Sequence, residues 1–145
     1  MTDSEIKAAL RQTRVIALVG YSANPARPSH RVAAFLHRCG YRVIPVNPGL
    51  AGQVALGEEI RASLADIPAD ITVDMVDVFR RPEALPQLVD EALAHLRAPW
   101  LLWTQLGVVH AAAAERVRAA GLVVIENRCP AIEIPRLFEP GFSVS

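Results

Sequence analysis

The chain has 145 residues, of which 52% are apolar, and its 15 basic and 15 acidic side chains balance. This length fits one domain, which we expect to span residues 1–145. Zero net charge argues against nucleic acid or an anionic membrane as a partner, because both attract a basic surface. These numbers remain compatible with a local basic pocket for one small anionic ligand.

Cysteine content and apolar patterning indicate where the protein works. The two cysteines, Cys39 and Cys129, are too few for a disulfide scaffold and lack a metal-binding spacing such as C-x-x-C. The first 12 residues are polar and charged, without the apolar stretch of a signal peptide. No apolar run approaches the roughly 18 residues of a membrane span. We therefore expect a cytoplasmic protein without a metal or a membrane partner.

The predicted elements alternate between apolar strands and amphipathic helices. A leading helix follows Thr2 or Asp3, either of which can cap it. Helices are also predicted at about 29–39, 82–96 and 110–120, and the glycine-containing segment 49–70 predicts only a short or broken helix. Gly40 and Gly121 stand where C-terminal glycine caps belong. Continuous apolar runs, typical of strands buried on both faces, predict strands at 14–20, 42–46, 71–78, 100–104 and 122–125.

This alternation predicts an α/β fold with a doubly wound sheet of five parallel strands. We expect the strand order 3-2-1-4-5, which the sequence barely separates from 2-1-3-4-5. The tail, residues 130–145, is expected to pack Ile132, Ile134 and Leu137 on the body before it frays.

Polar residues and glycines follow every predicted strand, and the carboxyl ends of parallel strands share the edge of the sheet where ligands bind. The loop after the first strand is the strongest candidate. Gly20 there lets a ligand approach the backbone, and the helix that opens at Pro28 and Ser29 offers its amides to a phosphate. The residues at this edge are Gly20, Tyr21, Ser22, Asn47, Pro48, Asp77, Phe79, Arg80, Arg81, Gln105, Gly107, Asn127, Arg128 and Cys129.

Familiar nucleotide-binding motifs are absent from this edge. The dinucleotide fingerprint G-x-G-x-x-G would need glycines where the chain has Ser22 and Pro25. Asn47 stands where an acid would hold a ribose 2′-hydroxyl, and the P-loop motif does not occur. Classical NAD binding and P-loop chemistry are therefore disfavoured.

Several longer motifs carry a family resemblance. They are Gly20-Tyr-Ser-Ala-Asn-Pro-Ala-Arg-Pro-Ser29, Gly40-Tyr-Arg-Val-Ile-Pro-Val-Asn-Pro48, Val76-Asp-Val-Phe-Arg80, Gln105-Leu-Gly-Val108 and Asn127-Arg-Cys-Pro130. The combination of the second with the Asp-Val-Phe-Arg of the third is specific, whereas either alone is a modest signal. With these motifs the chain resembles the stand-alone CoA-binding domain proteins over about residues 12–138. These proteins are related to the CoA-binding domain of succinyl-CoA synthetase and of the NDP-forming acyl-CoA synthetases. The resemblance implies a Rossmann-like fold that binds coenzyme A or an acyl-CoA across the strand edge.

The resemblance also implies which residues contact that ligand. Gly20, Tyr21, Ser22, Pro28 and Ser29 would line the phosphates, with charge from Arg27. Asn47 and Pro48 would border the adenosine end. Val78, Phe79, Arg80, Thr104 and Gln105 would flank the adenine or the pantetheine. The synthetase relatives carry a lysine where this chain has Leu50, so that charge is either missing here or supplied by Arg27 or Arg80.

Some single residues suggest further roles. His30 adjoins the phosphate loop and is a candidate phosphate donor. Cys129 lies beside Arg128, which would favour its thiolate, and it is a candidate for a mixed disulfide with the ligand thiol. Asp74 and Asp77 lie three apart on a predicted strand and face opposite sides, which argues against an acid/base pair. Cys39 is expected to pack in the core.

The sequence does not decide whether the protein has a protein partner, although some apolar residues are candidates for an interface. Trp100 and Trp103 are expected in the core or at an interface, and Leu101 and Phe142 are further interface candidates. A protein partner or a homodimer is compatible with the sequence.

No set of side chains assembles into a catalytic centre. The leading hypothesis is therefore a CoA-binding carrier, sensor or partner protein rather than a self-sufficient enzyme. One alternative is an oxidoreductase that uses a nicotinamide or flavin nucleotide in the same crevice. Another is an interaction domain whose crevice is vestigial.

Overall fold

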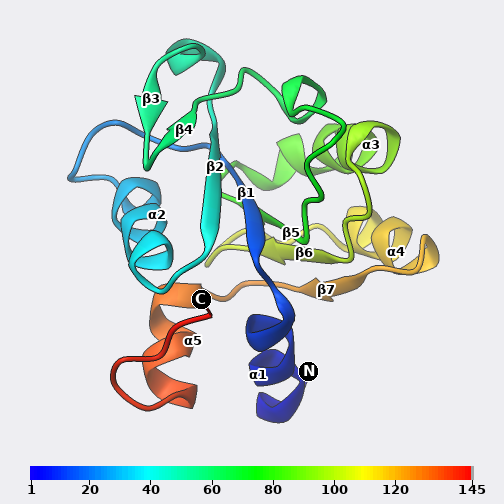
Figure 1. Ribbon diagram of the computed structural model, residues 1–145. Coiled ribbons are helices and arrows are strands. Elements are labelled where there is room, and N and C mark those ends of the chain that lie inside the picture. Colours follow the sequence, from blue (N-terminus) through cyan, green and yellow to red (C-terminus); the bar gives the residue numbers. More distant parts are fainter. Residues whose placement is uncertain (145) are drawn as a thin grey trace.

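The computed structural model describes residues 1–144 and shows a five-stranded parallel sheet with helices on both faces (Figure 1). The strands are β1 (Val15–Val19), β2 (Arg42–Val46), β5 (Met75–Val78), β6 (Leu101–Thr104) and β7 (Val123–Ile125). The helices are α1 (Asp3–Gln12), α2 (Pro28–Arg38), α3 (Leu85–His95), α4 (Ala111–Ala119) and α5 (Pro130–Leu137). The predicted α/β doubly wound, Rossmann-like fold is confirmed.

The strand order corrects the sequence-based expectation. The sheet runs β2-β1-β5-β6-β7, so the five strands follow the order 2-1-3-4-5 and the expected 3-2-1-4-5 is wrong. The difference places β2 at an edge of this sheet instead of between two strands. Pro45 within β2 gives the physical reason, because proline has no N–H for a second ladder and is confined within sheets to edge strands, strand starts or bulges.

The connection after β2 contains no α-helix. It forms the turns η1 (Pro48–Leu50) and η2 (Leu64–Asp66), separated by a small antiparallel hairpin of β3 (Val54–Ala55) and β4 (Glu58–Glu59). The third predicted helix begins as the short turn η3 (Pro82–Ala84) before α3. Gly40 and Gly121 have positive φ angles of 94° and 91° after α2 and α4, so the predicted glycine caps are confirmed.

The third strand begins at Met75 rather than at residue 71, and the side chain of Asp74, just before it, binds the start of β1. Its Oδ2 accepts hydrogen bonds from the backbone N–H groups of Arg14 at 3.0 Å and Val15 at 2.9 Å. This side chain joins the entry of β5 to the entry of β1. Asp74 and Asp77 form no acid/base pair, since Asp77 is bonded to Gln105 at the other end of the strand.

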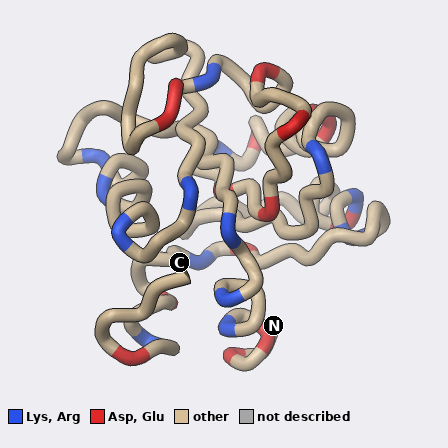
Figure 2. Tube along the Cα trace, in the orientation of Figure 1, with Lys and Arg blue, Asp and Glu red and all other residues tan. Residues whose placement is uncertain are grey.

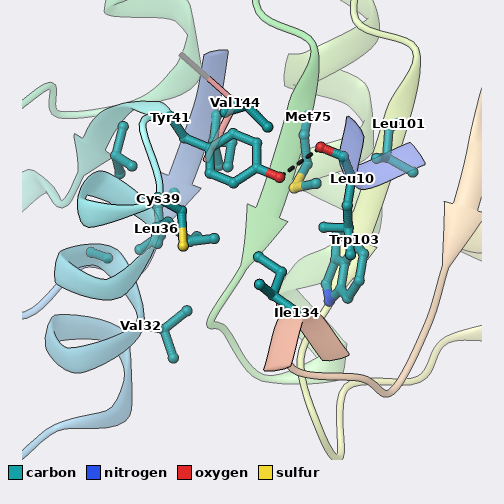
Figure 3. Close-up of a cluster of buried hydrophobic side chains, with 14 of the residues drawn as sticks. Leu10, Val32, Leu36, Cys39, Tyr41, Met75, Leu101, Trp103, Ile134 and Val144 are labelled. Atoms are coloured by element: carbon teal, nitrogen blue, oxygen red, sulfur yellow. Dashed lines mark hydrogen bonds between the residues drawn. The ribbon is translucent and has the colours of Figure 1, made fainter. Parts of the chain in front are cut away.

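Two apolar cores lie on opposite faces of the sheet. One is built under α1, α2 and α5 and contains Leu10, Leu36 and Trp103 (Figure 3). The other lies under α3 and α4 and contains Val78 and Leu88. Helices therefore cover both faces, as continuous apolar strands require.

The tail follows its prediction in part. Ile134 is 3% exposed and Leu137 packs against the same core, which is the i, i+3 spacing of one helix face. Ile132 is 54% exposed because it lies on the other side of α5, so that expectation is wrong. Val144 is buried beside Cys39, whose carbonyl accepts its N–H, and Ser145 lies outside the described residues.

Trp103 and Leu101 belong to the core and not to an interface. Both are fully buried, and the Trp103 indole donates a hydrogen bond to the carbonyl of Arg128 at 2.8 Å. Phe142 is partly buried and stacks on Phe138 at 3.9 Å between ring centroids. Cys39 is buried in the same core, as predicted.

Acidic and basic residues are both spread over the trace, but every charged residue between positions 7 and 42 is basic, and α2 carries basic residues only (Figure 2). Within residues 1–144 no helix is both long enough and apolar enough to cross a bilayer.

Candidate functional site

The strand order places a crevice between β1 and β5. The chain leaves β1 toward β2 on one side and leaves β5 toward β6 on the other, so the connections diverge at this point of the sheet. Ligands of doubly wound sheets bind where connections diverge, outside the carboxyl ends of the strands. Gly20 follows β1 there and Phe79 follows β5, and the Phe79 N–H donates to the carbonyl of Val19 at 2.8 Å.

Gly20 is required by the protein backbone itself. Its φ angle is 91°, and a Cβ atom at this position would lie 2.2 Å from the carbonyl oxygen of Phe79. The sequence analysis assigned the missing side chain to the approach of a ligand. The structure shows that it first allows β1 and β5 to end side by side.

Side chains from α2 and β2 hold the loop that follows Gly20. Asn47 donates from Nδ2 to the carbonyl of Tyr21 at 2.6 Å, and its Oδ1 accepts from the N–H of Gly49 at 2.8 Å. Nδ1 of His30 lies 2.9 Å from the carbonyl oxygen of Ser22 and must donate to it, since a carbonyl only accepts. One nitrogen of His30 therefore fixes the loop, and the ring stacks on Tyr21.

Three cavities follow one another along this edge. Cavity A, of about 510 Å³, lies between the ends of β1 and β2 and the helix α3, and it is lined by Val19, Gly20, Val46, Asn47, Pro48, Ala62, Ser63, Leu64, Phe79, Arg80, Leu88 and Glu91. Cavity B, of about 380 Å³, lies at the start of α2 and is lined by Gly20, Tyr21, Ser22, Arg27, Pro28, Ser29, Asn47 and Phe79. Cavity C, of about 570 Å³, is lined by Pro28, Phe79, Arg80, Arg81, Pro82, Gln105, Leu106, Val108 and Cys129.

The cavities share walls and so form one groove. Gly20 and Asn47 line both A and B, Pro28 lines both B and C, and Phe79 lines all three. Arg80 lines both A and C, so each cavity adjoins the other two and all three meet at Phe79. Each cavity alone is within the size range of small-ligand pockets, and together they suit an elongated ligand.

The groove brings together most of the residues that the sequence analysis singled out. Of those residues, the ones that line none of the three cavities are His30, Asp77, Val78, Thr104, Gly107, Asn127 and Arg128. Among them, Val78 and Thr104 were expected to flank the ligand, but both are fully buried. Val78 belongs to the core under α3 and α4. The Thr104 hydroxyl donates to the carbonyl of Val108 at 2.7 Å and accepts from the N–H of Asn127 at 3.1 Å, so it shapes the loop after β6.

Other groove residues were not identified from the sequence. Ser63 and Leu64 come from the connection after β2, whose path no local pattern predicts. Leu88 and Glu91 lie three residues apart on α3, the helix that follows β5, and so share one face of it. This spacing is the sequence signal that could have identified them. Both pairs reach the groove because α3 packs against η2.

The exposed cations along the groove are arginines. Arg27 lines cavity B, Arg80 lines A and C, and Arg81 lines C, and all three side chains are exposed. Guanidinium groups keep their charge at every physiological pH and match phosphate geometry. The groove can therefore attract an anionic ligand although the whole chain is neutral.

Asp77 is fully buried beside the groove. Its Oδ1 accepts from Nε2 of Gln105, a lining residue of cavity C, at 2.8 Å, and burial raises its pKa to about 7. Near neutral pH this carboxyl is partly protonated, and the neutral amide of Gln105, rather than a cationic side chain, is its hydrogen-bond partner.

Cys129 lines cavity C, but its thiol is not activated. Burial raises the pKa of the thiol above its ordinary value, although the backbone N–H groups of Ala131 and Ile132 oppose that rise. Arg128, which was expected to favour the thiolate, pairs with Glu133 at 2.8 Å. The suggested activation by Arg128 is therefore wrong.

Comparison with known proteins agrees with this geometry. The model of the CoA binding domain family matches residues 14–135. The chain belongs to this family. The matched range contains all five strands and every lining residue of the groove.

Relatives of similar length share the whole fold. An uncharacterized protein of Bacillus subtilis, YneT, is 40% identical over 128 residues, which cover 88% of this chain and 90% of that protein. A solved structure from Thermus thermophilus, cell-free ID.343, is 43% identical with a TM-score of 0.88, covering 95% of this chain and all of the other. A hypothetical protein from Pyrococcus horikoshii OT3 is 34% identical with a TM-score of 0.86, covering 94% of this chain and 92% of the other.

Proposed function

We propose that this protein binds coenzyme A or an acyl-CoA in the groove of cavities A, B and C. It acts as a single binding domain, a carrier, sensor or partner of another enzyme. The observation that carries the proposal is the groove itself, which runs along the edge of a CoA binding domain and has the Gly20 loop and the start of α2 in the wall of cavity B.

The chemistry of the three cavities suggests how the ligand lies. Cavity B joins the Gly20 loop to the N-terminal end of α2, where the helix dipole favours anions. Pro28 has no N–H and the N–H of His30 donates to the carbonyl of Arg27 at 3.2 Å, so Ser29 provides the first-turn N–H for the ligand. Cavity B suits the diphosphate. Cavity C is lined by the apolar side chains of Phe79, Leu106 and Val108, which suit the pantetheine arm. Cavity A then takes the adenosine end.

The arginines supply the charge that this ligand needs. CoA carries a diphosphate and a phosphate on its ribose. Arg27 lines cavity B, and Arg80 lines cavity A as well as cavity C. Leu50, at the position of the synthetase lysine, contributes packing against the core instead. We propose that Arg80 takes over the contact to the ribose phosphate.

The competing oxidoreductase hypothesis has less support. The loop after β1 lacks the second and third glycines of the dinucleotide fingerprint, and Asn47 at the end of β2 is engaged with Tyr21 and Gly49. The family match favours CoA.

The decisive experiment is thermal unfolding of the purified protein with CoA, acetyl-CoA, dephospho-CoA, NAD⁺, NADH or ATP at about 1 mM. A ligand at about 100 times its dissociation constant stabilises the native state by about 2.7 kcal/mol. We expect the CoA compounds to raise the Tm and the nicotinamides to leave it unchanged. A shift with NAD⁺ or NADH alone would transfer the assignment to the oxidoreductase.

Matched arginine variants locate the site. Arg80→Gln is expected to weaken CoA binding about tenfold and dephospho-CoA binding much less, because a charged hydrogen bond to the ribose phosphate contributes about 1.5–3 kcal/mol. Arg97→Gln is the control, since Arg97 is an exposed arginine that pairs with Thr72 at the opposite edge of the sheet. Equal losses in both variants would contradict the proposed position of the ligand.

A further inference from the structure

Asp77 and Gln105 form a hydrogen-bonded pair between the end of β5 and the loop after β6. Asp77 is 0% exposed and Gln105 is 7% exposed, and Oδ1 of Asp77 accepts from Nε2 of Gln105 at 2.8 Å. This is the one hydrogen bond of the Asp77 side chain within residues 1–144. Gln105 lines cavity C, whereas Asp77 lines none of the three cavities. Any contact with a ligand therefore belongs to Gln105, and Asp77 acts through it.

The pairing decides which end of the Gln105 amide faces the cavity. An ionised carboxylate only accepts hydrogen bonds, so the amide nitrogen turns toward Asp77 and the amide oxygen turns away from it. No group in residues 1–144 donates to Oε1 of Gln105, yet this atom is not among the buried oxygens without a partner, which are Oδ2 of Asp77 and Oε1 of Glu91. Oε1 of Gln105 therefore keeps accessible surface, and it opens into cavity C, which Gln105 lines.

The backbone of Gln105 is not available to a ligand. Its N–H donates to the carbonyl of Val78 at 3.3 Å, and its carbonyl accepts from the N–H of Val108 at 2.9 Å. These two hydrogen bonds fix the position from which the side chain extends. The side-chain amide is thus the polar group that Gln105 offers to cavity C.

This amide oxygen supplies an acceptor that the other side chains of cavity C lack. Arg80 and Arg81 carry guanidinium groups, which only donate, and the thiol of Cys129 is a weak donor and a weak acceptor. The remaining lining side chains are apolar. Oε1 of Gln105 therefore matches a ligand group that carries an N–H or O–H donor.

We propose that Asp77 is a positioning residue that sets the hydrogen-bonding polarity of cavity C by holding Gln105 with its oxygen toward the ligand. The pantetheine arm contains two amide groups, and the N–H of one of them supplies the matching donor. If the Gln105 amide were turned round, its NH2 group would oppose this N–H and both donors would be left unpaired. This inference rests on the proposed function, because it concerns the pantetheine arm of the same ligand.

The test is a double-mutant cycle on CoA binding, measured by titration calorimetry at pH 8, where Asp77, with a pKa of about 7, is mostly ionised. Gln105→Met removes the acceptor, and Asp77→Leu removes the group that holds the amide. Each variant should bind CoA about fivefold to tenfold more weakly than the wild-type protein, which is the loss expected from one hydrogen bond. The double variant should bind no more weakly than Gln105→Met, because Asp77 then has no amide to position.

Two further variants separate positioning from damage to the fold. Asp77→Asn keeps an oxygen that can accept from Gln105, so its CoA affinity should stay within about threefold of the wild-type value. Asp74→Leu makes the same substitution at the other end of the strand, where the acid accepts from the N–H groups of Arg14 and Val15. It should lower the Tm and leave the dissociation constant for CoA unchanged.

The amide protons of Gln105 provide a readout that needs no ligand. In nitrogen-15 NMR spectra of the free protein, these NH2 protons should exchange slowly with water in the wild-type protein and in Asp77→Asn. They should exchange rapidly in Asp77→Leu, because the amide has lost its buried acceptor.

The outcomes are distinct. Losses that multiply in the double variant, wild-type CoA affinity in either single variant, or rapid exchange of the Gln105 amide in the wild-type protein would overturn the role of Asp77 while leaving CoA binding intact. A loss in Asp77→Asn as large as that in Asp77→Leu would also overturn it, because the charge of Asp77 and not the orientation of Gln105 would then control binding. Absence of CoA binding by the wild-type protein would overturn the proposed function and this inference with it.

Discussion

Asp77 combines complete burial with a single hydrogen bond, and this combination makes stability depend on pH. Its pKa in the native state is raised to about 7 from an ordinary value of 3.8. The native state therefore binds this proton more tightly than the unfolded state. The stabilisation is complete below about pH 4 and is lost as the pH rises toward 7 and above.

Asp77→Asn should remove this dependence, because the amide stays neutral and its oxygen can still accept from Gln105. The stability of the variant relative to the wild-type protein should increase by about 4 kcal/mol between pH 4 and pH 8. Urea unfolding at four or five pH values measures this difference. Parallel stability curves for the two proteins would contradict the raised pKa.

A glycine can be required by a positive φ angle or by the lack of space for a side chain, and Gly20 and Gly52 distinguish these two requirements. Both have φ near 90°, but a Cβ on Gly20 would meet the Phe79 carbonyl at 2.2 Å, whereas Gly52 has open space around it. Gly52→Ala should cost about 1 kcal/mol from backbone strain alone. Gly20→Ala should cost at least about 3 kcal/mol, because one strand end must move. Equal losses in denaturant unfolding would mean that β1 and β5 end farther apart than described.

At the scale of elements, α1 shows how a terminal helix is held to the body. Its start carries a capping box between Thr2 and Glu5, which confirms Thr2 as the cap. Near its end, three carbonyls receive side-chain donors, and the carbonyl of Ala9 also accepts the backbone N–H of Thr13 at 3.2 Å. Thr13 donates to Ala9, Arg14 donates to Arg11, and the Tyr41 hydroxyl from the start of β2 donates to Leu10 at 2.6 Å (Figure 3).

Of these three hydrogen bonds, the one from Tyr41 to Leu10 joins α1 to the start of β2 within the core. Tyr41→Phe keeps the buried ring and leaves the Leu10 carbonyl without a donor, so the protein should lose about 1–2 kcal/mol. Hydrogen exchange should accelerate in α1 more than in the strands, because the helix opens before the sheet. Uniform acceleration across the chain would show that α1 and the sheet unfold as one unit.

At the scale of the whole molecule, the groove joins the ends of several strands that are far apart in the sequence. CoA binding should therefore slow amide exchange at once in residues 20–30, 47–49, 79–82 and 105–108. The β3–β4 hairpin is the internal control, because none of its residues lines the three cavities. Protection confined to a single loop would contradict one ligand lying along the full groove.

Local sequence patterns determined the elements and the binding edge. Continuous apolar runs identified the five strands because strands buried on both faces need apolar side chains throughout. The motifs around Gly20, Asn47 and Phe79 identified the family and most of the groove, since parallel strands bring their carboxyl ends to one edge regardless of strand order.

Only the tertiary structure decided how these pieces meet. The strand order depends on which strands pair, and the apolar runs of the five strands are too alike to distinguish 3-2-1-4-5 from 2-1-3-4-5. Pro45 was the one local signal, because proline favours an edge strand. The places of Glu91 and Ser63 depend on the packing of α3 against η2, which no local pattern encodes. Val78 and Thr104 are the last residues of β5 and β6, near the binding edge. They nevertheless face the core and a loop, because the direction of a side chain at a strand end is set by the neighbours that pack on it.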